Sequence, residues 1–119
     1  MKLITPELEE HFKSVGDQSA SHNPIIVAKF FDPVGSATWY ATEYDKETNI
    51  CYGYVTGLIY DEWGSFSIGE LESVKRPFGL TIERDINFIQ KRFHEQFPEK
   101  KRLNEIDKIL KEKNQEHER

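Results

Sequence analysis

The sequence predicts an α+β domain: an antiparallel β-sheet of four to five strands, an N-terminal helix, a short helix near 67–74 and a helical C-terminal tail. Segments rich in β-branched and aromatic residues, separated by turn signals, lie between residues 24 and 89, as expected for such a sheet. A capped amphipathic segment precedes them, and a highly charged segment of helix-forming composition follows them. We therefore expect a single α+β domain at 1–98 and a charged helical C-terminal extension at 99–119.

The first helix is predicted in the segment TPELEEHFKSVG. Thr5 is a suitable N-cap, Pro6 fits the first helical position, and Gly16 marks the end. Apolar side chains recur at helical spacing and give the helix one apolar face. These side chains are Leu8, Phe12 and Val15.

The sheet is predicted from five segments, at 24–31, 37–44, 50–60, 65–68 and 80–89. Turn signals separate the first four, in DPVGS, DKETN and DEWG. Glycines in the third segment indicate a bulge or a close backbone approach. Side chains alternate across a strand. In the second segment, one face would then carry Thr38, Tyr40, Thr42 and Tyr44, and the other Trp39, Ala41 and Glu43.

Short helical segments are predicted on either side of the last strand. Ser67 and Glu70 have the spacing of a capping box, and KRPFG would end the helix that they begin. The segment QKRFHEQF predicts a helical turn that ends at Pro98. In the tail, the apolar stripe is narrow, so both a docked helix and a partner-binding arm remain open. The stripe consists of Leu103, Ile106 and Leu110, with Ile109 beside them.

Length and composition limit the class of protein. The 119 residues are 37% hydrophobic and 31% charged, which is typical of one folded domain. The longest uncharged apolar run, at 24–28, is far too short to span a membrane, and the N-terminus becomes acidic at once, unlike a secretory signal. Cys51 is the only cysteine, so no intrachain disulfide forms and a reducing cytoplasm is the expected compartment.

The net charge of −5 is unevenly distributed. Residues 99–119 carry seven Lys or Arg and six Asp or Glu, a net +1, so residues 1–98 carry −6. An acidic body repels phosphate backbones and disfavours nonspecific nucleic-acid binding. It suits a basic protein partner, mimicry of nucleic acid, or solubility alone.

Motifs for cofactor and metal chemistry are missing from the sequence. It has no glycine-rich phosphate-binding motif and no cysteine-based or closely spaced histidine pair typical of zinc. The four histidines are scattered, and each is predicted to lie on the surface. Cys51 lies in a predicted strand without a basic neighbour, which indicates a buried, unreactive thiol. We therefore expect no cofactor and no metal site.

The carboxylates are the strongest candidates for enzymatic chemistry. In a meander, Glu43, Glu83 and Asp85 would converge at one end of the sheet and hold Mg²⁺ or Ca²⁺, or one of them would act as a general base. The alternative is that these carboxylates form structural ion pairs. We favour it because carboxylates in structural ion pairs are easily mistaken for those of a functional site. Arg84 lies between two of the acids, but strand alternation points it away from both unless a bulge intervenes.

Aromatic residues are concentrated between positions 39 and 66. Exposed aromatics on a sheet stack nucleic-acid bases where basic residues lie between them. From 37 to 66 the only basic residue is Lys46, so core packing is the better interpretation for most of these rings. A local basic cluster follows, which would meet a phosphate or an acidic peptide. It comprises Lys75, Arg76, Arg84, Lys91 and Arg92.

Three blocks of sequence together resemble a small uncharacterised bacterial family that is carried on plasmids, conjugative elements and phages. The blocks follow the patterns TWY-x-x-E-x-D, G-x-F-S-x-x-E-L-E-S-V and P-x-G-L-x-x-E-R-D-x-x-F, and the resemblance covers Leu3 to Phe88. Ser65 stands where an aromatic residue is expected, and Thr81 where proline is expected. The resemblance implies a mobile-element context and no established activity.

The leading hypothesis is a non-enzymatic accessory protein of a mobile element, which binds a host or element-encoded protein in the cytoplasm and does not bind a membrane. The expected binding residues are Trp39, Glu43, Glu72, Glu83, Arg84 and Asp85, with Trp63 as a further aromatic anchor. Arg84 would organise the carboxylates by bidentate pairing. The tail would be a second contact or an oligomerisation helix, and the oligomeric state is left open.

Two alternatives come from other classes of protein. One is a nucleic-acid-binding protein that uses the aromatic sheet face with Lys75, Arg76, Lys91 and Arg92. The other is a carboxylate-metal-dependent nuclease or phosphoesterase.

Overall fold

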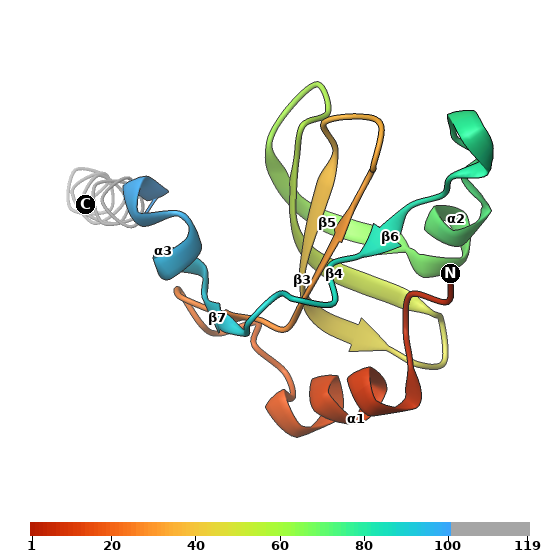
Figure 1. The fold of residues 1–119 in the computed structure, drawn as a ribbon. Coiled ribbons are helices and arrows are strands. Elements are labelled where there is room, and N and C mark those ends of the chain that lie inside the picture. Colours follow the sequence, from red (N-terminus) through yellow and green to blue (C-terminus); the bar gives the residue numbers. More distant parts are fainter. Residues whose placement is uncertain (101–119) are drawn as a thin grey trace, which may run out of the picture.

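The computed structural model describes residues 1–100, and it has the expected α+β fold. A five-stranded antiparallel sheet is accompanied by an N-terminal helix and two short helices (Figure 1). The predicted helical tail lies, from position 101 onward, outside the described residues.

The helices are α1 (Pro6–Val15), α2 (Ile68–Ser73) and α3 (Phe93–Gln96), and η1 (Pro77–Gly79) is a 3₁₀ turn. The strands are β1 (Ile25–Ile26), β2 (Ala28–Phe31), β3 (Thr38–Asp45), β4 (Ile50–Thr56), β5 (Glu62–Ser67), β6 (Glu83–Arg84) and β7 (Lys91–Arg92). The main sheet has the order β5-β4-β3-β2-β6, and β1 pairs with β7 in a separate two-stranded sheet. All pairings are antiparallel.

The predicted limits of the first helix are confirmed. The Leu8 amide donates a hydrogen bond to Thr5 Oγ1 at 3.2 Å, and Gly16 ends α1 with a left-handed φ of 76°. Leu8 and Phe12 are buried, and Val15 packs against the same core. The apolar face read from the sequence is therefore the face that packs on the sheet.

The inner face of the main sheet, defined by Phe30, Trp39, Ala41 and Cys51, carries the larger core. Both α1 and α2 contribute buried residues to it. The rings of Phe30 and Phe66 meet with centroids 6.5 Å apart, although β3 and β4 lie between their strands. In a flat sheet these strands would be about 14 Å apart, so the sheet curves around this core.

The outer face, defined by Tyr40, Tyr52, Tyr54 and Trp63, packs against the C-terminal segment. Phe93 of α3 contacts Tyr54 and Trp63, with ring centroids 5.1 and 4.7 Å apart. Tyr40 and Tyr54 are buried, whereas Tyr52 and Trp63 remain 42% and 37% exposed. Most of the central aromatic residues, but not all of them, therefore pack in a core.

The alternation predicted for β3 is wrong beyond Ala41. A β-bulge shifts the register of β3 against β4 between Ala41 and Glu43. Glu43 therefore lies opposite Tyr52 on the outer face. Tyr44 turns to the inner face, where its ring centroid is 5.7 Å from that of Phe12. The extra residue of the bulge inverts the facing of the residues that follow it.

The first predicted strand, 24–31, is divided at Val27 between the two sheets. The Val27 amide donates to the Ala41 carbonyl oxygen at 2.9 Å, which keeps the divided strand beside β3. The close approach predicted for a glycine of the third strand is found at Gly53, where an added Cβ would clash with the Tyr40 carbonyl oxygen. Strand β5 begins inside the predicted DEWG turn.

The last predicted strand, 80–89, contributes only Glu83 and Arg84 to the main sheet. The Asn87 amide donates to Asp85 Oδ1 at 3.0 Å, and the Phe88 amide donates to the Asp85 carbonyl oxygen. This turn ends the strand, because an aspartate that bonds its own backbone two residues on redirects the chain.

Candidate functional site

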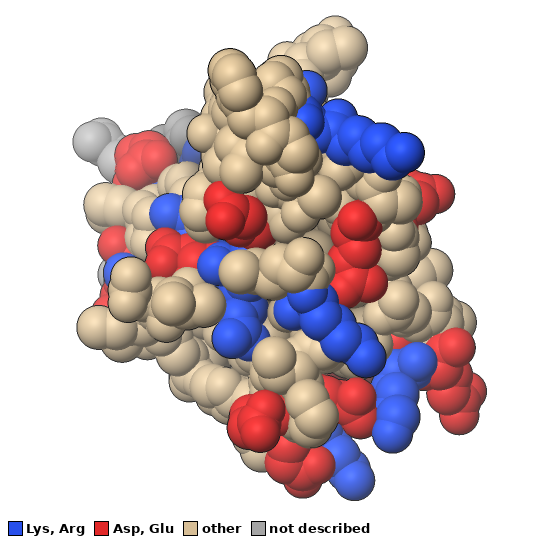
Figure 2. All heavy atoms as spheres, turned by 45° about the vertical axis from the view of Figure 1, so that its right-hand side comes forward, with Lys and Arg blue, Asp and Glu red and all other residues tan. Residues whose placement is uncertain are grey.

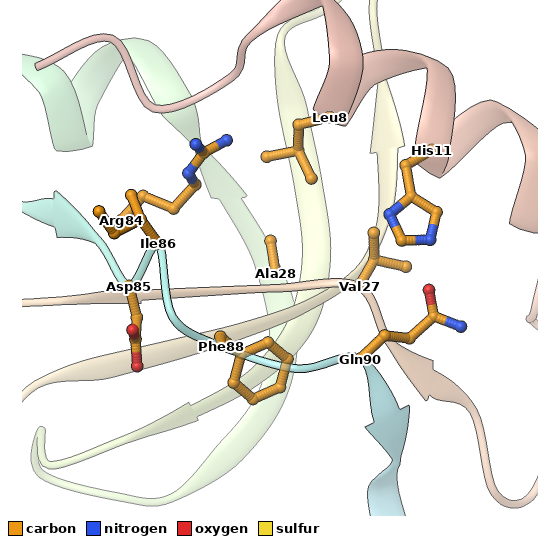
Figure 3. Close-up of a pocket in the computed structure, with 9 residues that line it drawn as sticks. All are labelled: Leu8, His11, Val27, Ala28, Arg84, Asp85, Ile86, Phe88 and Gln90. Atoms are coloured by element: carbon orange, nitrogen blue, oxygen red, sulfur yellow. The ribbon is translucent and has the colours of Figure 1, made fainter.

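A pocket opens between α1 and the segment 85–90, beside the point where β1 and β2 separate (Figure 3). It has a volume of about 180 Å³. The turn at Asp85 creates it, because the chain leaves the edge of β2 there and next forms a strand at Lys91. Five apolar residues line it, namely Leu8, Val27, Ala28, Ile86 and Phe88, and the polar lining residues are His11, Arg84, Asp85 and Gln90.

Arg84 extends from β6 toward α1, on the pocket side of the strand (Figure 3). Its Nη1 donates a hydrogen bond to Thr5 Oγ1 at 3.3 Å. No ion pair joins Arg84 to an acidic side chain in the described part of the chain. The predicted bidentate pairing with Glu83 and Asp85 is therefore wrong, and strand alternation, which points adjacent side chains in opposite directions, is the reason.

Asp85 points away from Arg84 in Figure 3 and pairs on the other side of the strand. Its Oδ2 lies 3.8 Å from Lys29 Nζ, and both side chains are 29% exposed. The ammonium group of Lys29 also lies 5.9 Å from the centre of the Tyr40 ring. Asp85 therefore has the structural ion pair that the sequence favoured, although Lys29 and not Arg84 is the partner.

The other predicted acids lie on separate elements. Glu72 on α2 accepts a hydrogen bond from the Leu3 amide at 2.8 Å, which holds the N-terminal segment against the body. Glu83 lies opposite Phe31 at the edge of the main sheet. Glu43 lies beyond the bulge of β3, on the outer face. These acids do not form one polar face.

The expected convergence of Glu43, Glu83 and Asp85 is not found. Glu83 pairs with Phe31, and Phe31 pairs with Thr38. Glu83 is thus level with a residue five positions along β3 from Glu43, or about 16 Å at 3.3 Å per residue. Within residues 1–100 no group of three or more His, Cys, Asp or Glu side chains is placed to hold a metal ion.

Glu43 nevertheless has a perturbed acidity. Burial raises its pKa, and the nearby carboxylate of Asp17 raises the pKa further, while a hydrogen bond with the Gln18 backbone lowers it. With Tyr52 and Ser65, Glu43 lines a second pocket of about 240 Å³ on the outer side of β4.

The two tryptophans proposed as anchors lie in different environments. Trp39 is 8% exposed and belongs to the inner core, so it is not available to a partner. Trp63 is exposed and stacks on Tyr52, with ring centroids 6.0 Å apart. Of the two, Trp63 alone is placed to serve as a surface anchor.

The predicted basic cluster is not one surface. Lys75 and Arg76 precede η1, whereas Lys91 and Arg92 form β7, far from η1 in Figure 1. Arg76 is also neutralised by Asp32, with Nε and Oδ2 3.0 Å apart. Figure 2 shows basic and acidic side chains interspersed on one face of the molecule, without a broad basic region.

The sequence interpretation missed His11, Ile86 and Gln90 as pocket residues. Of these three, only His11 could have been found from the sequence. It follows Leu8 by three positions, so the two side chains lie on the same side of α1. Cys51, in contrast, is confirmed as a core residue: it is fully buried, and burial raises the pKa of its thiol. No helix among the described residues is both long enough and apolar enough to cross a membrane.

The fold and the pocket together define a small α+β domain with a concave site beside its first helix. A family model described as "Protein of unknown function (DUF2958)" matches residues 3–106. The match spans most of the chain, so the chain belongs to this family, which confirms the expected membership of an uncharacterised family. Searches of curated proteins and of solved structures found no significant match.

Proposed function

We propose that this domain is a protein-binding module whose Arg84 pocket accepts an apolar side chain that is adjacent to a carboxylate in a partner protein. The environment of Arg84 carries the proposal. Its guanidinium donates to the neutral hydroxyl of Thr5 and has no acidic partner in the described part of the chain. A carboxylate from the partner would supply the counter-charge through charge-assisted hydrogen bonds.

The size of the pocket favours a side chain over a metabolite. Sites for small molecules and cofactors usually enclose about 300–1,000 Å³. This pocket, at about 180 Å³, is smaller than that range. A single leucine- or phenylalanine-sized group fits such a space, and Leu8, Val27 and Ala28 give it an apolar lining.

The rim of the pocket also suits a protein partner. Ile86, which lines the pocket, is 71% exposed, and Ile89 on the same segment is 76% exposed. Exposed aliphatic side chains beside a concave, partly charged centre are typical of an interface in which a few anchors contribute most of the affinity.

The arrangement favours binding over catalysis. Arg84 and Asp85 point to opposite sides of the strand, so they do not act together on one bound group. His11 is the pocket residue closest in chemistry to a general base. In the described part of the chain, neither Arg84 nor Asp85 forms a hydrogen bond or an ion pair with it. A metal-dependent reaction at the carboxylates has no supporting cluster among residues 1–100.

The sequence resemblance supplies the biological setting of the proposal. A family carried on plasmids, conjugative elements and phages would bind a protein of the host or of the element itself, in the bacterial cytoplasm. Nucleic-acid binding is the other candidate, and the acidic body of the domain disfavours it.

A peptide array with the purified protein tests the proposal. It presents peptides in which Asp or Glu flanks Leu, Ile or Phe, each beside a matched peptide with Asn or Gln in place of the acid. We expect the acidic peptides to bind. We expect Arg84→Gln to lower their affinity about tenfold or more, because hydrogen bonds to charged groups contribute about 1.5–3 kcal/mol.

Lys13→Gln is the matched control, since it removes one positive charge from an exposed position near the end of α1 and should leave binding unchanged. Equal binding of the acidic and amide peptides, or of wild type and Arg84→Gln, would contradict the proposal. Capture from host lysate with and without nuclease then names the partner, and recovery of nucleic acid in place of a protein would favour the alternative. Circular dichroism confirms that each variant is folded.

A further inference from the structure

Exposed apolar residues gather at one end of the molecule, where the β2–β3 loop, the β4–β5 loop and η1 lie (Figure 1). We call this surface the apolar end. It consists of Val34 (38% exposed), Leu58 (59%), Ile59 (90%), Tyr60 (74%) and Phe78 (94%). The upper part of the face seen in Figure 2, where this end lies, is mostly uncharged, with basic side chains at its margin.

Phe78 is held in an unfavourable backbone conformation at this end. Its φ of 64° and ψ of 24° are left-handed, a region that bulky residues rarely adopt. Its side chain gains nothing from burial in the monomer, because it is almost fully exposed. A strained residue that presents an aromatic ring to solvent points to a contact outside the chain.

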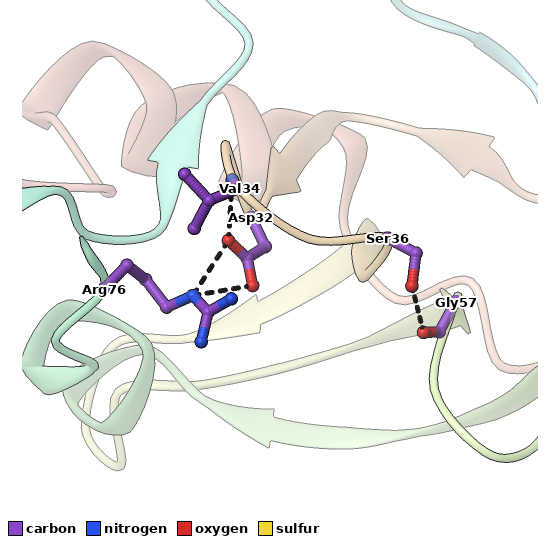
Figure 4. A network of polar contacts seen from close by, with 5 residues as sticks. All are labelled: Asp32, Val34, Ser36, Gly57 and Arg76. Carbon is purple, nitrogen blue, oxygen red and sulfur yellow. Dashed lines mark hydrogen bonds and ion pairs between the residues drawn. The ribbon is translucent and has the colours of Figure 1, made fainter. Parts of the chain in front are cut away.

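A polar network fixes the three segments of the apolar end (Figure 4). Arg76 Nε lies 3.0 Å from Asp32 Oδ2, which joins the start of η1 to the β2–β3 loop. The Val34 amide donates to Asp32 Oδ1 at 3.0 Å. Ser36 Oγ donates to the Gly57 carbonyl oxygen at 2.7 Å, which joins that loop to the β4–β5 loop. The apolar residues are thus preorganised for contact, which lowers the entropic cost of binding.

The extent of the apolar end fits a protein interface. An aromatic side chain buries about 150–250 Å² when covered, so Phe78, Tyr60 and the aliphatic residues beside them expose several hundred Å². Monomeric proteins rarely expose a larger apolar area than this, and a standard interface buries about 800 Å² per partner.

The charges around this end differ between its two sides. Asp61 and Glu62 directly follow the apolar tip of the β4–β5 loop, and both are exposed. Lys75 is exposed three residues before Phe78, and the neighbouring charge of Arg76 is neutralised by Asp32. One side is therefore apolar with acidic residues. The other is apolar with Lys75, which has no ion pair among residues 1–100.

We propose that the apolar end is a homodimer interface, in which a two-fold axis places the η1 side of one copy against the β4–β5 loop of the other. Phe78 packs on Ile59 and Tyr60 of the second copy, and Lys75 faces the second copy's Asp61 and Glu62. A two-fold contact needs this kind of self-complementarity, because residue i meets j while j meets i. The acids at the loop tip would be repelled by an anionic membrane, which disfavours lipid as the occupant.

Sedimentation equilibrium of the purified full chain, from low micromolar to several hundred micromolar, tests the proposal. Wild type is expected to associate to a dimer, and Phe78→Asn to weaken the dimer at least tenfold. Asparagine tolerates the left-handed conformation, so the same variant should raise the melting temperature by about a few degrees when both proteins are compared at a concentration low enough for wild type to be monomeric. Weaker association in a more stable protein separates loss of an interface from loss of folding.

Ile86→Ser is the matched control. Like the residues of the apolar end, Ile86 is an exposed apolar residue, but it lies at the Arg84 pocket, so its removal should leave the dimer intact. Lys75→Glu should weaken the dimer, and adding Glu62→Lys to it should restore association. The proposal is overturned if wild type stays monomeric over the whole range, if Phe78→Asn still dimerises fully, or if the charge exchange fails to restore association. Binding of the monomer to anionic phospholipid vesicles would overturn it in favour of a membrane.

Discussion

The inner and outer faces of the main sheet are covered by different parts of the chain. The inner face is covered by α1 and α2, and its buried residues come from helices and strands far apart in the sequence. The outer face is covered by α3, which is linked to β1 through the two-residue strand β7. Its buried aromatic rings meet at tilted or edge-on angles, whereas the exposed rings of Tyr52 and Trp63 stack on each other.

This difference predicts that the two faces, although both carry large side chains, contribute unequally to stability. A side chain on the inner face holds several elements together at once, whereas a ring on the outer face mainly holds α3. We therefore expect inner-face substitutions to destabilise the whole domain, and outer-face substitutions to act mostly on the C-terminal segment.

The largest effect is expected from Phe30→Ala on the inner face. Phe30 is fully buried and contacts Phe66 across the curved sheet. The cavity should lower the free energy of unfolding by about 3–5 kcal/mol. Urea denaturation followed by far-ultraviolet circular dichroism measures it. A loss below about 1 kcal/mol would show that the inner core does not determine global stability.

A smaller effect is expected from Phe93→Ala on the outer face. Phe93 is 2% exposed, but it borders the exposed ring of Trp63, so the site can relax after truncation. We expect a loss of about 2–3 kcal/mol, with early loss of amide protection in α3 and little change in α1. Hydrogen exchange resolves the two helices. Equal loss of protection in both would remove the distinction between the faces.

A still smaller effect is expected from Arg76→Gln, which breaks the pair between η1 and the β2–β3 loop. The Asp32 side chain is only 12% exposed, so its pairing should be worth about 1 kcal/mol, above the value for most surface pairs. Lys46→Gln is the comparison, because Lys46 is 76% exposed where it pairs with Glu9. Thermal denaturation of both variants should show the larger decrease for Arg76→Gln. The reverse order would contradict the role assigned to the network.

The smallest effect, of opposite sign, is expected from Glu43→Gln at the edge of the outer face. The pKa of Glu43 is raised above its ordinary value of 4.5, mainly by burial. The folded protein therefore binds this proton more tightly than the unfolded chain, and stability falls as pH rises through the raised pKa. The glutamine variant should melt about one degree higher at neutral pH. That advantage should vanish below pH 4.5, and its persistence there would contradict the assignment.

Local signals in the sequence predicted the elements that depend on local chemistry. Thr5 and Gly16 bound α1 because capping and left-handed conformations are properties of single residues. Ser67 caps α2 through the amide of Glu70 at 3.2 Å for the same reason. The hairpin between β3 and β4 follows from the turn residues between them.

Features that depend on distant partners were not predicted. The bulge after Ala41 is supported by Gln18, whose side-chain amide donates to the carbonyl oxygens of Ile25 and Thr42. Nothing in the spacing of the polar loop that contains Gln18 reveals this contact. The candidate site shows the same limit, because the pocket depends on α1 meeting a segment about seventy residues later in the chain. Of its lining residues, only Arg84 and Asp85 were candidate binding residues in the sequence.

The placement of the two tryptophans has a spectroscopic consequence. Trp39 is buried in the inner core, whereas Trp63 lies partly exposed on the outer face beside Phe93. Their emission should therefore contain a blue-shifted component that resists iodide quenching and a red-shifted component that does not. The chain thus carries an intrinsic fluorophore for each face, and single Trp→Phe variants would let each be followed alone.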